Sequence, residues 1–123
     1  FERYEVSNFA KGGAYSRHNM GYWEMKNYLG IGLSAHSLFG RRRFYNVSNI
    51  KEYIAAPNNE LEEEILTDND FEEEYVMLAL RTKKGIDLAD YAARFNASFL
   101  EKYSEKLKKL AKFLDITNSF VLI

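Results

Sequence analysis

The chain has 123 residues, of which 46% are apolar and 15% aromatic, so it can bury a core and is not a disordered polypeptide. Its 17 basic and 18 acidic residues give a formal net charge of -1, which excludes a global field that would gather nucleic acid or an anionic membrane surface. With no cysteine, it supplies no disulfide, thiolate metal site or thiol nucleophile.

The apolar runs are short and the ends are unusual. The longest run, Tyr75 to Leu80, is far below the roughly 20 residues of a membrane-spanning helix, and no secretory signal opens the chain. We therefore expect a cytoplasmic protein without a membrane span. The chain starts at Phe1 rather than Met and stops on four apolar residues, Phe120 to Ile123, so we expect a fragment of a longer parent.

Residues 1–47 are expected to alternate short extended runs with loops, and a helix follows them. Alternation at period two predicts a strand over Tyr4–Phe9, which the glycines after Lys11 end. The glycines of the next apolar run allow close approach of another backbone or a ligand. The other elements expected here are a short helix over Tyr22–Tyr28, a buried strand over Leu29–Leu33, a weaker strand over Arg43–Val47, and a helix capped by Asn49 or Ser48 and running to about Ala56.

The acidic stretch of residues 58–70 is expected to hold a short helix and to connect two domains. From Phe71 the apolar period becomes helical and predicts a first helix that ends before Gly85. Asp87 can cap a second helix through Ala93, and Ser98 a third whose buried face runs from Phe99 to Leu114. Alternation around Asn118-Ser119 predicts a closing hairpin. Three helices followed by a hairpin is the order of a winged-helix-like module.

The densest group of functional side chains lies between Ser16 and Trp23. A neutral histidine such as His18 is a competent axial ligand of heme iron. Tyr22 and Trp23 can flank a planar macrocycle, and a cation from Arg17, Lys11 or the run Arg41-Arg42-Arg43 can pair with its carboxylates. The alternative is structural: His18 caps a helix or holds a loop, and Trp23 belongs to the core.

His36 and the basic runs allow two interpretations each. His36 follows the expected strand Leu29–Leu33, where ligands gather at strand ends, but it is equally a structural histidine. The run Arg41-Arg42-Arg43 is typical of a solvated loop. Lysines of the last helix alternate with Glu101 and Glu105, as on an exposed face, so we expect no nucleic-acid binding.

Several strings in combination resemble one family. These are Tyr4–Lys11, Ser16–Trp23 with its HNxxYW pattern, Tyr28–Ser37, Glu73–Arg81 and Lys84–Ile86. Together they resemble the oxygen-independent coproporphyrinogen oxidase and heme-chaperone family of radical-SAM proteins, and HNxxYW resembles the signature of its heme-chaperone branch. The resemblance covers essentially the whole chain.

The resemblance implies a parent with a partial β/α barrel, a four-iron cluster held by a CxxxCxxC motif, and S-adenosylmethionine on the open iron. Without cysteine this chain cannot hold that cluster. The fold class implied is α+β, with the terminal part of the barrel in residues 1–57, the connector in 58–70 and a helical, winged-helix-like domain in 71–123. The resemblance assigns heme binding to His18, Asn19, Tyr22 and Trp23, with His18 as the iron ligand. It places Ser34, Ala35 and His36 beside S-adenosylmethionine.

The function implied is that of a heme chaperone, with heme or porphyrin, the rest of the barrel and a heme-acceptor protein as partners. The alternative is an enzyme that oxidatively decarboxylates coproporphyrinogen III to protoporphyrinogen IX. A DNA-binding winged-helix regulator is disfavoured by the net charge. We expect no catalysis from this chain by itself, and we expect it to self-associate, because strands separated from a barrel expose edges and apolar faces.

Overall fold

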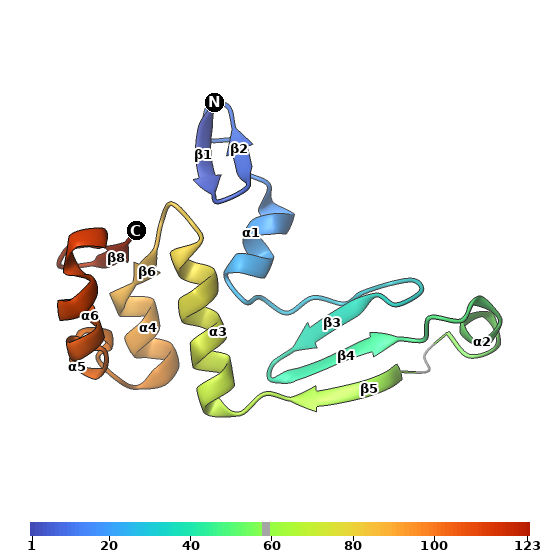
Figure 1. Ribbon diagram of the computed structural model, residues 1–123. Helices are drawn as coiled ribbons and strands as arrows, with labels where there is room; N and C mark the ends of the chain where they lie inside the picture. The colour runs from blue at the N-terminus through green and yellow to red at the C-terminus, as the bar shows by residue number, and fades with distance from the viewer. Residues whose placement is uncertain (58–59) are drawn as a thin grey trace. The chain divides into compact units, whose positions relative to one another are not determined.

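A computed structural model describes residues 1–57 and 60–123 of the chain (Figure 1). The chain divides into two compact units, one formed by residues 1–24 with 74–123 and the other by residues 25–73. Both units contain helices and strands, which confirms the mixed class expected from the sequence. The assignment of residues 1–57 to a barrel and of 71–123 to a separate domain stays a prediction.

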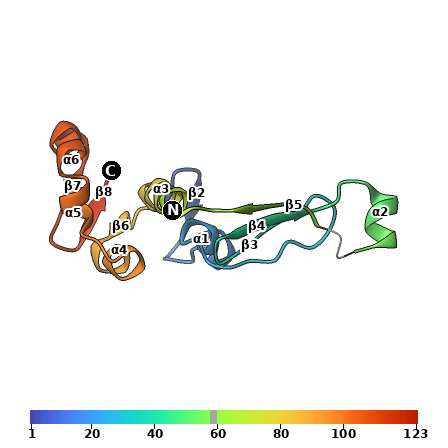
Figure 2. The ribbon, with the colours of Figure 1, turned by 90° about the horizontal axis from the view of Figure 1, so that it is seen from below.

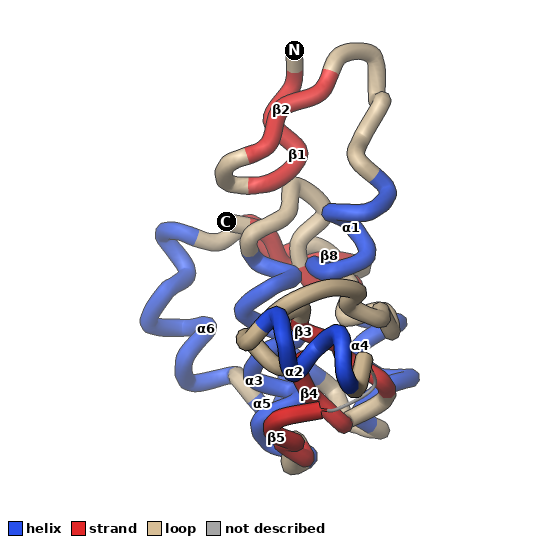
Figure 3. The backbone as a smooth tube through the Cα atoms, turned by 90° about the vertical axis from the view of Figure 1, so that its right-hand side faces the viewer, coloured by secondary structure: helices blue, strands red, loops and turns tan. Residues whose placement is uncertain are grey.

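The first unit opens with a hairpin rather than with the single strand expected over Tyr4–Phe9. Strand β1 (Glu2–Glu5) pairs antiparallel with β2 (Asn8–Ala10), as Figure 3 shows. The expectation was wrong because the Glu5 carboxylate accepts a hydrogen bond from the backbone N–H of Ser7 at 2.9 Å and so stabilises the reversal of the chain. The alternation of polar and apolar residues does not reveal a side chain that hydrogen-bonds to the backbone of its own turn.

The helix expected over Tyr22–Tyr28 begins earlier and ends earlier. Helix α1 spans Arg17–Trp23, and the Ser16 hydroxyl accepts a hydrogen bond from Asn19 N–H at its start. Met25 has a φ of 52°, in the left-handed region, so the chain leaves the helix there. Ser16 rather than a residue near Tyr22 therefore sets the position of the helix.

The rest of the first unit alternates helices and short strands. After α3 (Asp68–Leu80), the chain forms β6 (Ile86–Asp87), α4 (Leu88–Phe95), α5 (Phe99–Lys102), α6 (Ser104–Leu110), the 3₁₀ turn η1 (Ala111–Phe113), β7 (Asp115–Ile116) and β8 (Phe120–Leu122). The strands form one antiparallel sheet with β8 between β6 and β7. Gly85, with a φ of 69°, lies so close to Val121 that a Cβ there would meet the Val121 carbonyl oxygen at 2.2 Å.

Most expectations for this region are confirmed. Asp87 caps α4 through hydrogen bonds from the N–H groups of Ala89 and Asp90, and Ser98 caps α5. The hairpin around Asn118-Ser119 forms as β7 and β8. The third helix, however, is broken at Tyr103, whose φ of -102° and ψ of 12° lie outside the helical range. An aromatic core holds these helices, and its buried or half-buried rings are Tyr75, Tyr91, Phe95, Phe99 and Tyr103.

The second unit is a three-stranded antiparallel sheet with a short helix. Strands β3 (His36–Phe39), β4 (Arg42–Asn46) and β5 (Glu60–Ile65) pair in that order, and α2 (Ile50–Ala55) lies beyond the end of β4, as Figure 2 shows. The predictions of β4 and of an Asn49-capped helix are confirmed, because the Asn49 side chain accepts hydrogen bonds from Lys51 N–H and Glu52 N–H.

Two other expectations for the second unit are wrong. The run Leu29–Leu33 is a loop, with Leu29 71% and Ile31 85% exposed, and not a buried strand. Residues 60–65 form β5 where the acidic connector was expected to be helical, because cross-strand ion pairs with the arginines of β4 offset the acidic charge. Residues 58–59 of the connector lie outside the described residues. In the described ranges, none of the helices has the length and apolar character that crossing a bilayer requires.

Candidate functional site

The HNxxYW residues lie on α1, and the helical spacing of four divides them into two pairs. His18 and Tyr22 lie on one side of the helix and are exposed to solvent. Asn19 and Trp23, one position further along, are partly buried and contact other segments of the first unit. The structure therefore brings the four residues together on one helix, with one pair available at the surface and the other engaged in packing.

The outward pair interacts within itself. The hydroxyl of Tyr22 and Nε2 of His18 are 3.0 Å apart, within hydrogen-bond distance. Their rings meet edge to face with centroids 4.8 Å apart. Both side chains stay exposed, so an external ligand can reach the imidazole.

The inward pair rests on residues from two distant segments. The Asn19 side-chain amide donates a hydrogen bond to the Asn8 side-chain oxygen at 3.3 Å. The Arg81 guanidinium lies over the Trp23 ring, with its central carbon 5.0 Å from the ring centroid. Asn8 begins β2 and Arg81 follows α3, so these contacts tie α1 to two distant segments of the first unit.

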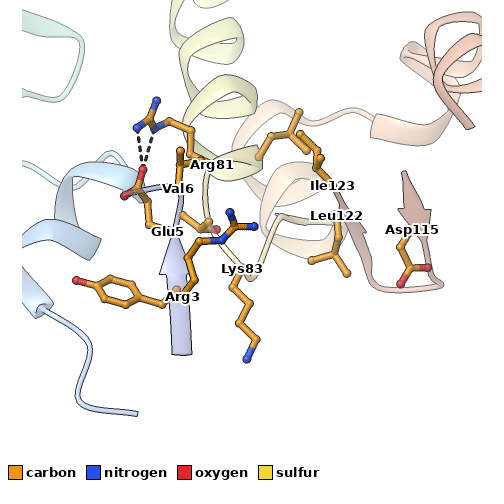
Figure 4. Close-up of a pocket in the computed structure, with 11 residues that line it drawn as sticks. Arg3, Glu5, Val6, Arg81, Lys83, Asp115, Leu122 and Ile123 are labelled. Atoms are coloured by element: carbon orange, nitrogen blue, oxygen red, sulfur yellow. Dashed lines mark hydrogen bonds and ion pairs between the residues drawn. The ribbon is translucent and has the colours of Figure 1, made fainter. Parts of the chain in front are cut away.

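A buried carboxylate joins Asn8 and Arg81. The Glu5 residue is only 1% exposed, and its Oε1 accepts hydrogen bonds from Nε and Nη2 of Arg81 at 3.1 and 2.8 Å (Figure 4). Oε2 accepts from Ser7 N–H at 2.9 Å and from the Asn8 side-chain amide at 2.7 Å. Burial acts to raise the pKa of Glu5, but the hydrogen bonds from Ser7, Asn8 and Arg81 outweigh it and hold the pKa below its ordinary value.

The link between Glu5, Asn8 and Arg81 could not be predicted from the sequence. Both Tyr4–Lys11 and Glu73–Arg81 stood out for their resemblance, but no periodicity links two polar residues that are 76 positions apart. No local signal singled out Glu5, because it stands among polar residues such as Arg3, Ser7 and Asn8. A glutamate in such a stretch is usually exposed to solvent.

A pocket of 440 Å³ lies beside this ion pair, lined by residues of β1, β8 and the segment after α3 (Figure 4). Arg3 and Lys83 contribute cationic side chains to its wall, and Leu122 and Ile123 contribute apolar ones. None of the residues that line it comes from α1. The pocket is therefore separate from the surface that His18 and Tyr22 form.

Ser34, Ala35 and His36 lie in the second unit, where the loop of residues 29–35 meets β3. Ser34 has a φ of 54° and its N–H donates to the Val47 carbonyl at 3.1 Å. His36 is exposed, and its ring lies beside that of Tyr45 on the neighbouring strand, with centroids 5.0 Å apart. The three residues thus present a shaped backbone and one accessible imidazole.

The glycine-containing loop before them is held by polar side chains. The buried Asn46 amide donates to the carbonyl oxygens of Gly30 at 3.1 Å and Gly32 at 2.9 Å. The Ser37 hydroxyl accepts from Gly30 N–H, and the Tyr53 hydroxyl accepts from Gly32 N–H. The predicted close approach of another backbone is confirmed at Gly30, where a Cβ would meet the His36 carbonyl oxygen at 2.2 Å.

The cationic side chains near the two sites differ in whether they form ion pairs. Arg41, Arg42 and Arg43 form ion pairs with Asp68, Glu63 and Glu64 at 2.7, 2.9 and 3.4 Å. Arg17 and Lys11 are exposed, and no ion pair is found for either within the described residues. Of the cations predicted to bind carboxylates, Arg17 and Lys11 are therefore the ones with accessible charge in the unit that carries His18.

Clusters of side chains that could hold a metal ion were sought in the described residues. No group of three or more histidine, aspartate or glutamate side chains gathers in residues 1–57 and 60–123, and the sequence has no cysteine. A thiolate-held iron–sulfur cluster does not fit this chain. A single exposed imidazole such as His18 does fit axial ligation of a heme iron.

Comparison with known proteins finds a family match for one segment of the chain. Residues 66–115 match the HemN C-terminal domain. The predicted resemblance to the oxygen-independent coproporphyrinogen oxidase and heme-chaperone family of radical-SAM proteins is confirmed.

Curated relatives extend the similarity over almost the whole chain. The heme chaperone HemW of Bacillus subtilis is 36% identical over 123 residues, covering 95% of this chain and 32% of that protein. The heme chaperone HemW of Lactococcus lactis is 35% identical over 112 residues, covering 89% of this chain and 30% of that protein. This chain thus spans about a third of the length of these relatives.

A solved structure shares the fold. The coproporphyrinogen III oxidase HemN from Escherichia coli, described as a radical SAM enzyme, superposes with a TM-score of 0.59 at 21% identity. The match covers 80% of this chain and 25% of that one. This similarity shows the fold of the HemN-type C-terminal part, which agrees with the mixed helices and strands described above.

Proposed function

We propose that the chain is the C-terminal part of a radical-SAM heme chaperone and that α1 provides its contact with heme. The observation that carries the proposal is the division of the HNxxYW residues into the exposed pair His18 and Tyr22 and the anchored pair Asn19 and Trp23. An exposed imidazole on an anchored helix is suited to bind a ligand without collapse of its support. The names of the HemW relatives support the same function.

His18 is the proposed axial ligand, and heme supplies the iron that accepts its lone pair. The imidazole stays reachable because both His18 and Tyr22 are exposed. Arg17 and Lys11 are the proposed partners of the heme carboxylates, since the arginines of β4 and the turn before it are already in ion pairs. Tyr22 keeps its proposed role beside the macrocycle at the surface, whereas Trp23 supports the site through the packing of α1.

The remaining family assignments are proposals about a longer parent. The four-iron cluster and S-adenosylmethionine belong to a part that supplies cysteines, and Ser34, Ala35 and His36 are proposed to border the S-adenosylmethionine site. The order of helices and strands from α3 to β8, with β8 between β6 and β7, supports a winged-helix-like domain. For the parent, the expected location is the cytoplasm, and a heme-acceptor protein is the expected partner.

Association with further barrel strands is supported by the second unit. Its apolar side chains Leu29, Ile31, Phe39, Ile54 and Ile65 are largely exposed. Apolar surface of this kind favours burial against a partner. We propose that the rest of the barrel covers it and that the chain alone associates with further copies.

The alternative function is oxidative decarboxylation of coproporphyrinogen III, which the fold shared with the Escherichia coli enzyme brings into consideration. At 21% identity that likeness concerns the fold. The HNxxYW pattern favours the chaperone. A decarboxylation assay of the parent protein separates the two, because product formation would establish the enzyme.

Titration with hemin tests the proposed ligand. His18→Ala should weaken binding by about tenfold or more and shift the Soret band, since an axial ligand is lost. His36→Ala is the matched control, because His36 is also exposed and also lies beside a tyrosine ring. Equal affinity and an unchanged spectrum for His18→Ala would remove His18 as the ligand.

A further inference from the structure

We propose that the Glu5–Arg81 ion pair is a positioning device that holds α1 in place for heme binding. Residues from two distant segments of the first unit then set the affinity of a heme site that neither Glu5 nor Arg81 contacts. The inference rests on the proposed function of His18. Glu5, Asn8 and Arg81 are positioning residues here, since none of them belongs to the exposed surface of His18 and Tyr22.

The Glu5–Arg81 ion pair has a fixed geometry. All four hydrogen bonds to the Glu5 carboxylate come from donors within 2.7 to 3.1 Å, two on each oxygen. A buried carboxylate is costly unless it is paired and hydrogen-bonded, and with this set of donors it has one favoured orientation. The Arg81 guanidinium is thereby held in one orientation as well.

Asn8 and Arg81, two of the side chains that bind the Glu5 carboxylate, both contact α1. Asn8, which donates to Glu5, accepts from Asn19, and the Arg81 guanidinium lies over Trp23. Asn19 and Trp23 are one helical turn apart, so the helix is held at two points along one face. Rotation of α1 about its axis, which would turn His18 and Tyr22 away from their present direction, breaks both contacts.

The backbone of Arg81 also binds the hairpin that carries Glu5. The Arg81 carbonyl oxygen accepts from Val6 N–H at 3.1 Å, and Lys83 N–H donates to the Tyr4 carbonyl oxygen at 2.9 Å. The hairpin, α1 and the end of α3 are therefore one connected structure. The loss of the guanidinium should affect α1 while these backbone bonds keep the hairpin in place.

The test is a hemin titration of the protein with the variants Arg81→Lys and Asn8→Ala. Lysine keeps the charge but loses the planar fork and the flat contact with Trp23. Both variants should bind hemin about tenfold more weakly with the Soret position unchanged, because the ligand is the same and only its placement is looser. Lys83→Gln is the matched control, since it removes the exposed ion pair with Glu2 at 2.8 Å and should leave the affinity unchanged.

A double-mutant cycle with His18→Ala separates positioning from general destabilisation. If Arg81 acts through the direction of His18, the effect of Arg81→Lys should vanish once His18 is absent. Wild-type affinity in both Arg81→Lys and Asn8→Ala, or an equal loss with and without His18, would overturn the proposal. Failure of the proposed function would give a different result, because the His18→Ala variant by itself would then bind hemin as tightly as the wild type.

Discussion

Nε2 of His18 and the hydroxyl of Tyr22 lie 3.0 Å apart on the exposed face of α1, so this imidazole nitrogen already has a hydrogen-bond partner. Binding through Nε2 requires this hydrogen bond to be given up. The two residues are four positions apart, and their contact is therefore a direct product of helix geometry.

Removal of the tyrosine hydroxyl should strengthen heme binding. A hydrogen bond of this kind contributes about 0.5–1.5 kcal/mol, so Tyr22→Phe should raise hemin affinity by roughly two- to tenfold while the ring is kept. Hemin titration by absorbance measures this. Tyr45→Phe, which alters the tyrosine beside His36, serves as the control. Weaker binding in Tyr22→Phe would mean that the hydroxyl orients the imidazole for binding instead of competing for it.

Two glycine-to-alanine substitutions should change stability in opposite directions. At Gly30 a Cβ would lie 2.2 Å from the His36 carbonyl oxygen, so Gly30→Ala should destabilise the protein by about 1–3 kcal/mol. At Gly21, within α1, a Cβ has no neighbour within 4 Å, and alanine should stabilise the helix by about 0.5–1 kcal/mol. Urea unfolding of both variants measures the two changes. A stable Gly30→Ala protein would show that the loop does not pack against β3 as described.

Acid should weaken the fold through Glu5. Its folded-state pKa lies below the ordinary value of 4.5, so the ionised carboxylate stabilises the native state fully above that pH. Stability should then fall as the pH drops from about 4.5 through the lower folded pKa, because the unfolded chain takes up the proton first. The measurement is the urea midpoint at pH 7 and at successive pH values below 4.5.

Glu5→Gln provides the comparison for this pH dependence. The variant should be less stable than the wild type at pH 7, since the ion pair with Arg81 is lost, and its urea midpoint should fall less on acidification. Asp70 and Asp87 also have lowered pKa values, from hydrogen bonds of Thr67 and of the Asp90 backbone respectively, so some acid sensitivity remains in the variant. Parallel curves for the two proteins would rule out Glu5 as a contributor.

Local signals in the sequence were sufficient for many elements. Asn49, Asp87 and Ser98 each cap the helix that was expected after them, because a cap depends on residues within three positions. The hairpin around Asn118-Ser119 likewise needs only a short alternation and a turn. The family resemblance rested on strings of this kind and needed no coordinates.

Errors arose where a distant partner decides the local structure. Leu29–Leu33 reads as a buried strand, yet Asn46 and Tyr53 hold its backbone as a loop. The acidic residues of β5 read as a solvated connector, yet arginines of β4 pair with them. In both cases a side chain more than ten positions away supplies the interaction.

By itself, the sequence determined that His18, Asn19, Tyr22 and Trp23 belong to one motif, but the helix expected from it began only at Tyr22, so the helix face that each residue shares came from the structure of α1. Only the tertiary structure decided which face is outward, since that depends on Glu5 and Arg81 meeting across 76 positions to support Asn19 and Trp23. Helical periodicity is a property of neighbouring residues. The direction in which a helix presents its side chains depends on what packs against it, and here that packing joins two segments that are 76 positions apart in the chain.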